Sequence, residues 1–521
     1  MKIFKYGEEK LTIAIAISIA NGETKGIISD VAAKKISKSQ NNVQTIVEKG
    51  ATVYGINTGF GSLCTTVISK GDTKKLQTNI LRSHSVGIGD NIPDTIAKLM
   101  MILKVHALSQ GYSGIQQSTL ERIIWHIDND IIPKVPSKGS LGASGDLAPL
   151  AHLFLPLIGL GVVSYNGKIT DTQAVFQKES LSPIELAAKE GLALINGTQF
   201  IAAHAIYVVA NLLNTLDVAD IVGAMSLEAM LGSINPFKSA LHDIRPFKGS
   251  IHVAHRLTHI LSGSQMVESH ENCDRVQDPY SLRCMPQVHG ASRNAWLHLK
   301  ELVDIEINAV TDNPIILSAE ESISGGNFHG QPLALPLDYA TLAAHELGNI
   351  SERRTYLLLE GKEGLPQLLM KETGTNSGFM IPQYTAAALV SENKSLCFPA
   401  SADSIPSSLG QEDHVSMGSI SGRKALQVID NLEGVLAIEL LCAAQAFDFR
   451  RPLKSSILLE ACHEYIRQNI DHAEEDRVFA HDINIAKSIV QSGELVNILK
   501  KQANDKNINL KSKFDELFRL H

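Results

Sequence analysis

The chain has 521 residues, with 47 lysine and arginine residues against 55 aspartate and glutamate residues, so its net charge is −8. This mildly acidic balance argues against a nucleic-acid-binding protein, which would present a basic surface. Hydrophobic residues make up 44% and charged residues 20% of the sequence, which excludes a disordered chain. The length allows a large hydrophobic core.

The N-terminal region is mixed. Four isoleucines between residues 13 and 19 alternate with small residues, which is the period of a strand, but the intervening alanines favour a helix, so both remain open. Ser29-Asp30 predicts the start of a helix that contains Val31, Ile36 and Val43. Glu8 precedes this region, and its acidic flank argues against a secretory signal over residues 11–20.

From about residue 100 the pattern is mostly helical. Leucine and isoleucine recur at helical spacing between residues 426 and 440, and Pro452 closes that segment. Residues 202–231 and 334–360 are also long and rich in alanine and leucine. Polar loops that contain glycine separate the helices and are suitable places for a functional site: 138–146, 195–198, 274–283, 324–330 and 407–414.

We predict a mixed N-terminal domain over residues 1–110 and a helical-bundle domain over residues 111–521. No membrane span is expected. The apolar stretch 147–163 is short for a bilayer and contains His152 and Pro156. The longer stretch 201–234 is interrupted by polar residues, which predicts a buried pair of helices: His204, Asn211, Asn214, Asp217 and Asp220.

The six cysteines form no C-x-x-C pair: Cys64, Cys273, Cys284, Cys397, Cys442 and Cys462. Their spacing argues against a zinc cluster, and their small number argues against a disulfide scaffold. A reducing compartment fits this usage, so a cytoplasmic location is expected.

Several common signatures fail at one position. Gly59-Phe60-Gly61 lacks the third glycine of a dinucleotide-binding loop. His345-Glu346 begins an H-E-x-x-H pattern, but Asn349 replaces the second histidine, so a metal site has little support. The segment Gly142-Ala143-Ser144-Gly145-Asp146 has aspartate where a serine-hydrolase elbow needs glycine.

That last segment is a tight turn leading into a helix, with Asp146 in position to cap it. Alanine, serine and glycine are the smallest residue types, and Gly145 can adopt conformations that are closed to other residues. An isolated Ala-Ser-Gly turn would be structural. The longer segment 142–150, however, resembles the signature loop of the histidine and phenylalanine ammonia-lyase family.

Further segments resemble the same family in the same order along nearly the whole chain. They are the tyrosine loop 53–61, the Asn-Gly-Thr turn at Asn196, the segment 276–284 around Tyr280, Thr311-Asp312-Asn313-Pro314, the loop 325–330 and Gln411-Glu412-Asp413-His414. Any one of these segments alone could be a structural loop. Together they favour family membership.

The resemblance implies a mainly α fold with a long central helical bundle, of the fumarase/aspartase-like lyase architecture. It also implies a homotetramer with active sites shared between subunits and a small amino acid as substrate. Ala143, Ser144 and Gly145 would cyclise, with loss of two waters, to the electrophile methylidene-imidazolone. No metal, diffusible cofactor, nucleic acid or membrane is expected to be needed.

The resemblance also implies residue roles. Tyr54 would be the base that takes the substrate β-proton. Arg283 would bind the substrate carboxylate, although without the family it would be interpreted as a surface salt bridge. Tyr280 and Asn196 would donate hydrogen bonds to the prosthetic group or to developing charge. Gln277 would belong to the same polar shell, and Phe328 would pack against the substrate ring.

Two residues indicate the substrate. Glu412 matches the histidine-specific form of its segment, because a carboxylate suits an imidazole and would be poorly satisfied beside a phenyl ring. His84, in Arg82-Ser83-His84-Ser85, is a weaker indication of the same kind. We therefore expect elimination of ammonia from L-histidine to give trans-urocanate. The alternatives are a tyrosine or phenylalanine ammonia-lyase, a 2,3-aminomutase of the same family, and a non-catalytic helical scaffold.

Overall fold

The computed structural model describes residues 2–50, 52–59, 61–63, 65–66, 68–69, 71–271 and 275–520. Phe60 of the predicted tyrosine loop, Asp274 of a predicted polar loop, and Cys64 and Cys273 lie outside these ranges. The remaining cysteines are free thiols: Cys284, Cys397, Cys442 and Cys462.

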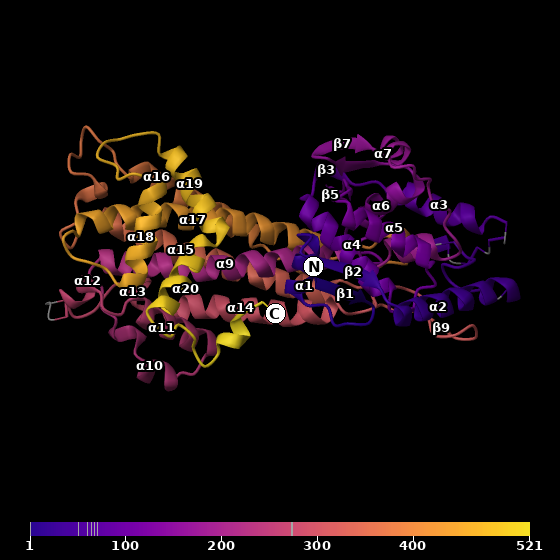
Figure 1. The fold of residues 1–521 in the computed structure, drawn as a ribbon, viewed down its shortest axis with the longest axis horizontal. Coiled ribbons are helices and arrows are strands. Elements are labelled where there is room, and N and C mark those ends of the chain that lie inside the picture. The colour runs from indigo at the N-terminus through magenta and orange to yellow at the C-terminus, as the bar shows by residue number, and fades with distance from the viewer. Residues whose placement is uncertain are drawn as a thin grey trace.

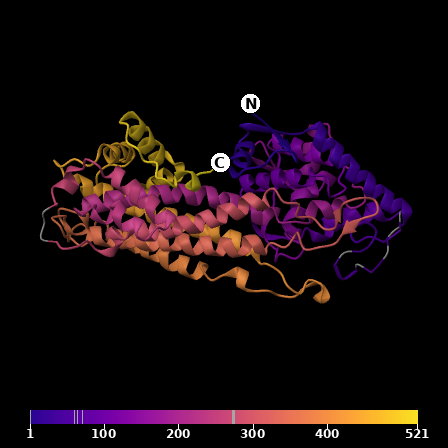
Figure 2. The ribbon, with the colours of Figure 1, turned by 90° about the horizontal axis from the view of Figure 1, so that it is seen from below.

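The molecule is elongated, with short elements gathered at one end of a bundle of long helices (Figures 1 and 2). The helices before the bundle are α1 (Ile13–Ala20), α2 (Asp30–Lys49), α3 (Thr73–His84), α4 (Asp94–Leu108), α5 (Gln117–Asp128), α6 (Leu147–Phe154), α7 (Thr172–Lys178) and α8 (Glu190–Ile195). The strands of this end are β1 (Lys2–Tyr6), β2 (Thr24–Ile28), β3 (Ile88–Asn91), β4 (Ile132–Pro133), β5 (Pro136–Lys138), β6 (Val162–Tyr165) and β7 (Lys168–Asp171).

The strands form small sheets. Strands β1 and β2 are parallel, with Lys2 opposite Thr24 and Tyr6 opposite Ile28, and α1 connects them. Strand β3 pairs with β5, and β6 lies between β4 and β7. Of the two possibilities left open for residues 13–19, the helix is correct. The Thr12 side chain accepts a hydrogen bond from the Ile15 N–H at the start of α1, and one face of the helix is buried.

The predicted N-terminus of the next helix is also confirmed. The Ser29 hydroxyl accepts from the Ala32 N–H, and α2 runs to Lys49 before Gly50 ends it in a left-handed conformation. Ile36 and Val43 are buried on its inner face, whereas Val31 is exposed.

The bundle consists mainly of α9 (Gln199–Ala229), α14 (Met285–Glu306), α15 (Gln331–Leu359) and α17 (Gly418–Phe449), which pack on one another. Further helices surround them: α10 (Ser239–Asp243), α11 (Lys248–Ile260), α12 (Gln265–Glu268), α13 (Tyr280–Arg283), α16 (Met380–Leu396), α18 (Ile457–Asn469), α19 (Phe479–Ser492) and α20 (Glu494–Asp505). A short hairpin of β8 (Ile315–Ile316) and β9 (Ser322–Ile323) precedes α15. The predicted mainly α fold with a long central bundle is confirmed, and the division at residue 110 stays a prediction.

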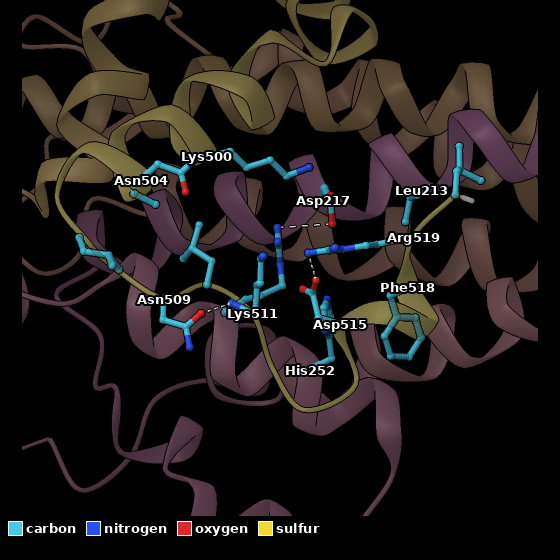
Figure 3. A pocket seen from close by; sticks show the side chains of 15 residues that line it. Leu213, Asp217, His252, Lys500, Asn504, Asn509, Lys511, Asp515, Phe518 and Arg519 are labelled. Atoms are coloured by element: carbon cyan, nitrogen blue, oxygen red, sulfur yellow. Dashed lines mark hydrogen bonds and ion pairs between the residues drawn. The ribbon is translucent and has the colours of Figure 1, made fainter. Parts of the chain in front are cut away.

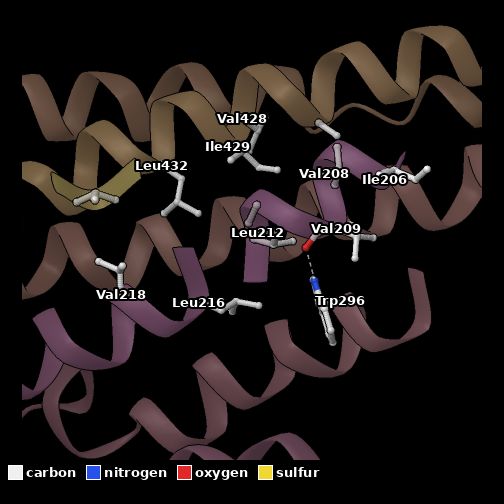
Figure 4. Close-up of a cluster of buried hydrophobic side chains, with 14 of the residues drawn as sticks. Ile206, Val208, Val209, Leu212, Leu216, Val218, Trp296, Val428, Ile429 and Leu432 are labelled. Carbon is white, nitrogen blue, oxygen red and sulfur yellow. Dashed lines mark hydrogen bonds between the residues drawn. The ribbon is translucent and has the colours of Figure 1, made fainter. Parts of the chain in front are cut away.

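The bundle core is apolar and closely packed. Branched side chains of α9 meet those of α17, including Val428 and Leu432, while Trp296 of α14 lies on the other side of α9 (Figure 4). The Trp296 indole N–H donates to the Val209 carbonyl at 2.8 Å, which satisfies the one polar atom of this buried ring. The pattern at residues 426–440 therefore predicted α17 correctly, because its leucines and isoleucine, three or four positions apart, pack in this core.

The prediction of a helix pair over residues 201–234 is wrong, because α9 is one continuous helix of 31 residues. Its polar side chains do not break it because they find buried partners. Asp220 accepts from Arg256 Nε at 2.9 Å and from His289 Nδ1 at 2.9 Å. Helix α9 is long and apolar enough to cross a membrane, but 67% of its most apolar window is buried inside the protein.

Candidate active site

The Ala-Ser-Gly turn has a strained backbone. Gly142, Ser144 and Gly145 have positive φ angles of +96°, +51° and +79°, and Gly142 and Gly145 face each other in an antiparallel bridge. Serine rarely adopts this left-handed conformation. A Cβ atom on Gly145 would lie 2.1 Å from the Gly197 carbonyl oxygen, so only glycine fits there.

Two distant segments hold this turn in place. The Asp146 N–H donates to the Gly197 carbonyl at 2.8 Å, and the Gly197 N–H donates to the Ser144 carbonyl at 3.2 Å. On the other side, the Met417 N–H donates to Leu141 O at 3.0 Å. The N-termini of α6, α9 and α17 therefore meet at the tripeptide, and their dipoles favour negative charge nearby.

Asp146 is the residue that ties the turn to the bundle. It occupies the N-cap position of α6, as expected, but its side chain does not cap that helix. Its carboxylate accepts instead from the Ile201 N–H in the first turn of α9 at 3.0 Å and from the Ser140 hydroxyl at 3.3 Å. The side chain is fully buried, and burial raises the pKa of Asp146 to about 7.

A cavity of about 640 Å³ opens in front of the tripeptide. Five of the predicted site residues line it: Tyr54, His84, Ala143, Ser144 and Glu412. They come from the tyrosine loop, the end of α3, the turn before α6 and the loop before α17. The structure thus brings together segments that are more than 350 positions apart in the sequence.

The loop with Glu412 packs directly on the tyrosine loop. The Gly61 N–H donates to the Tyr54 hydroxyl at 3.2 Å, and a Cβ atom on Gly61 would lie 3.2 Å from Glu412 Oε1. The other carboxylate oxygen, Oε2, is buried and has no hydrogen-bond partner among the described residues. A buried carboxylate oxygen without a partner is costly, so Glu412 is suited to bind a donor group of a ligand.

His84 is half-buried at the C-terminal end of α3. Its Nδ1 atom lies 3.0 Å from the Ser83 hydroxyl. Burial lowers the pKa of His84, so its ring is neutral near pH 7 and has one donor and one acceptor nitrogen.

Asn196 lies directly beside the tripeptide, one residue before Gly197. Its Nδ2 atom donates to the Asn313 carbonyl at 2.8 Å and to Asp312 Oδ1 at 3.2 Å. Its Oδ1 atom is buried and lacks a hydrogen-bond partner in the described part of the chain. The predicted Thr311-Asp312-Asn313-Pro314 segment therefore positions the Asn196 amide.

Two buried lysines complete this network, and the sequence reasoning missed both. Lys189 forms an ion pair with Asp312, and Lys104 Nζ donates to Asn196 O at 2.6 Å. Burial lowers the pKa of Lys104 to about 7. For Lys104, the sequence does contain a signal: it is the single lysine inside the apolar run 99–108. A fully buried lysine almost always has a specific partner, so this position could have indicated a buried contact.

Four predicted site residues lie elsewhere. Gln277 and Arg283 line a separate cavity of about 380 Å³, at the end of the bundle that carries α13 and lies away from α3 and α6 (Figure 1). Arg283 lies over the Tyr280 ring at 4.5 Å, and Tyr280 is 71% exposed. Phe328 is half-buried in the loop before α15 and is not among the residues that line the tripeptide cavity.

The comparison with known proteins agrees with this geometry. The aromatic amino acid lyase family matches residues 11–468. The chain belongs to this family. A histidine ammonia-lyase of Idiomarina loihiensis is 45% identical over 476 residues, which cover 91% of this chain and 93% of that relative.

Two solved structures show the same fold. The histidine ammonia-lyase from Trypanosoma cruzi has a TM-score of 0.88 and 39% identity, covering 96% of each chain. The tyrosine aminomutase from Streptomyces globisporus has a TM-score of 0.92 and 34% identity, covering 98% of this chain and 100% of the other.

The raised pKa of Asp146 makes stability depend on pH. The folded state holds this proton up to about pH 7, whereas an aspartate exposed to water has an ordinary pKa of 3.8. The stability that Asp146 contributes is therefore complete below its unfolded pKa and is lost as the pH rises through about 7. Asp146→Asn keeps an acceptor for Ile201 but cannot ionise. We expect its melting temperature to fall less than that of the wild type over this pH range.

Asp90→Asn is the matched control, because Asp90 is exposed. Its melting curve should follow the wild type at every pH. Parallel pH profiles for the wild type and Asp146→Asn would contradict the assignment of this titration to Asp146.

Proposed function

We propose that the chain is a histidine ammonia-lyase that converts L-histidine to trans-urocanate and ammonia. The observation that carries this proposal is the unpartnered Glu412 carboxylate oxygen in the cavity that also contains Ser144. An imidazole N–H is a donor that this oxygen lacks, whereas a phenyl ring has none. The names of the histidine ammonia-lyase relatives support the same substrate.

The tripeptide fits the proposed methylidene-imidazolone. The Gly145 nitrogen would bond to the Ala143 carbonyl carbon with loss of one water, and Ser144 would lose its hydroxyl as the second water. The antiparallel bridge and the positive φ angles already fold the tripeptide back on itself. The group supplies an electrophile that no standard side chain provides.

The other cavity residues fit the rest of the elimination. Tyr54 takes the β-proton, and the Gly61 N–H that donates to its oxygen stabilises the deprotonated form. Glu412 and the neutral His84 orient the imidazole. The substrate C–N electron pair leaves with ammonia as the carbon–carbon double bond forms. The Asn196 amide nitrogen donates to Asp312 and to the Asn313 carbonyl, so the group that Asn196 leaves open beside the tripeptide is its acceptor oxygen, Oδ1.

The remaining residues would reach the cavity from another subunit. Gln277, Tyr280 and Arg283 are exposed or half-buried at the opposite end of the bundle, as expected for groups that complete a partner's site. We therefore propose a homotetramer with shared active sites, in which Arg283 binds the substrate carboxylate and Phe328 contacts the substrate ring. The cysteine usage supports a cytoplasmic location.

Purified protein should produce urocanate from L-histidine and no product from L-tyrosine or L-phenylalanine, measured by ultraviolet absorbance. Its intact mass should be two waters below the mass calculated from the sequence. Ser144→Ala removes the hydroxyl that must be eliminated, so it should lack the mass deficit and be inactive. Product from tyrosine or phenylalanine alone would contradict the proposed substrate.

Glu412→Gln tests the contact with the imidazole. Losing a charged hydrogen-bond acceptor should lower kcat/KM for L-histidine by roughly ten- to a hundredfold. The neighbouring Asp413→Asn, at an exposed position, is the matched control and should keep near wild-type activity. A wild-type kcat/KM in Glu412→Gln would exclude this role.

Shared sites can be tested by mixing two inactive variants. Tyr54→Phe and Arg283→Lys should each be inactive alone. After co-expression, a site is complete when its Tyr54 comes from an Arg283→Lys chain and its Arg283 comes from a Tyr54→Phe chain. Random assembly makes about a quarter of the sites complete, so about a quarter of wild-type activity should return. Co-expression of either variant with the double variant is the control and should restore none. No recovery in the mixed tetramer would mean that both residues come from one chain.

A further inference from the structure

A second cavity, of about 490 Å³, lies between the bundle and the C-terminal segment. Its walls come from α9, α11, α20 and residues 508–520 (Figure 3). The residues on α20 and in the C-terminal segment lie beyond the range 11–468 that the family matches. None of its lining residues lines the tripeptide cavity.

Basic side chains converge on this cavity from three elements. Figure 3 shows Lys500 of α20 and Arg519 of the C-terminal segment extending toward Asp217 of α9. Arg256 of α11 is only 4% exposed. Its Nη2 atom lies 3.4 Å from Asp217 Oδ1 but forms no hydrogen bond within the described residues. A buried guanidinium with an open donor is suited to bind an oxyanion.

The charges of the lining do not balance. Four basic side chains face two carboxylates, which leaves an excess of two positive charges; the basic residues are Arg256, Lys500, Lys511 and Arg519. Arg519 is paired with Asp515 and, outside the lining, with Glu516 at 2.9 Å. Asp217 is paired with Arg293 at 2.8 Å, and Arg256 Nε is paired with Asp220 at 2.9 Å. Lys500 and Lys511 have no ion-pair partner in the part of the chain that the structure describes.

The titratable groups of the cavity also report a positive potential. Burial would raise the pKa of Asp217, but Arg256, Arg293 and Lys500 outweigh burial and hold that pKa below its usual range. Burial, together with the nearby Arg293 and Arg256, lowers the pKa of His252 to about 2. The His252 ring is therefore neutral, and its Nδ1 atom lies 2.9 Å from the Ser512 hydroxyl.

Part of the cavity lining is apolar. Leu213, Leu510 and Phe518 line it, and the Phe518 ring packs on the ring of His252 at 4.8 Å between centroids. A ligand that fills the cavity would therefore need an apolar or aromatic part as well as an anionic group. The volume is in the range of sites for small organic molecules.

We propose that this cavity binds a small organic phosphate. Its phosphate group would pair with Arg256, Lys500 and Arg519, and its apolar part would pack on Leu213 and Phe518. A phosphate dianion matches the excess of two positive charges, and its tetrahedral oxygens suit cations that approach from three elements. The site is separate from the proposed active site, so this proposal does not rest on the proposed function.

Calorimetric titration of the full-length protein without L-histidine tests the proposal. Adenosine monophosphate, adenosine and inorganic phosphate are the probes, at an ionic strength held constant with sodium chloride. We expect adenosine monophosphate to bind more tightly than either fragment. Lys500→Gln should weaken its binding about tenfold, the effect of losing one charged contact. Lys501→Gln, an exposed neighbour outside the cavity, is the matched control and should bind as the wild type does.

Leu213→Asp provides a second test, because it places a carboxylate in the same cavity. It should abolish phosphate binding, and its melting temperature shows whether the variant is folded. No binding of any probe to the wild type would overturn the proposal. Equal weakening in Lys500→Gln and Lys501→Gln would show non-specific surface binding and would also overturn it. Equal affinity for inorganic phosphate and adenosine monophosphate would overturn the proposal that the cavity recognises the organic part of the ligand.

Discussion

The close approach of Gly145 to the Gly197 carbonyl oxygen is the constraint on which the candidate site depends. It presses the Ala-Ser-Gly turn against the start of α9, a core helix of 31 residues. Asp146 secures the same junction from its other side by accepting from the α9 backbone. The turn cannot move without moving the bundle, so a rigid scaffold holds the strained backbone of Ser144 in place.

Buried polar groups are used in two different ways in this molecule. Glu439 in the bundle is saturated: it accepts from Arg354, Ser226 and Ser351, and each of its carboxylate oxygens has a partner. At the tripeptide cavity, Glu412 Oε2 and Asn196 Oδ1 each lack a partner among the described residues. A saturated group such as Glu439 holds helices together, whereas an open acceptor can bind a donor of a ligand or prosthetic group.

Much of this arrangement follows from local sequence. The spacing at residues 426–440 predicted α17 because its inner face packs on α9. The residue types at 143–145 pointed to the tripeptide turn, and Gly145 indeed has no room for a side chain. The same local reasoning failed for α9. The partners that let Asp217 and Asp220 remain inside a continuous helix lie on α11 and α14, at Arg256, His289 and Arg293.

Long-range contacts of this kind have no local signature. Nothing near Lys104 in the sequence indicates that its ammonium group fixes the Asn196 carbonyl, which is 92 positions away. The sequence allowed each segment of the candidate site to be identified, but it did not show how far apart these segments lie in the folded chain. The position of Arg283 is the clearest example, since its segment matches the family pattern while the fold of one chain places it away from Tyr54.

The length of helix α15 gives the distance between the Ala-Ser-Gly turn and α13. Gly330, at its start, lies against Ser416, which also contacts the turn at Gly142. Near its other end, Arg354 Nη1 is 3.5 Å from the Ser281 carbonyl in α13. Residues 330 and 354 are about 36 Å apart along a helix, at about 1.5 Å per residue. No side chain spans that distance. If Tyr280 and Arg283 act on a substrate beside Ser144, they must come from a second copy whose α13 end lies beside the tripeptide cavity. An antiparallel pair with twofold symmetry would make this exchange reciprocal, because each bundle would then complete its partner's site.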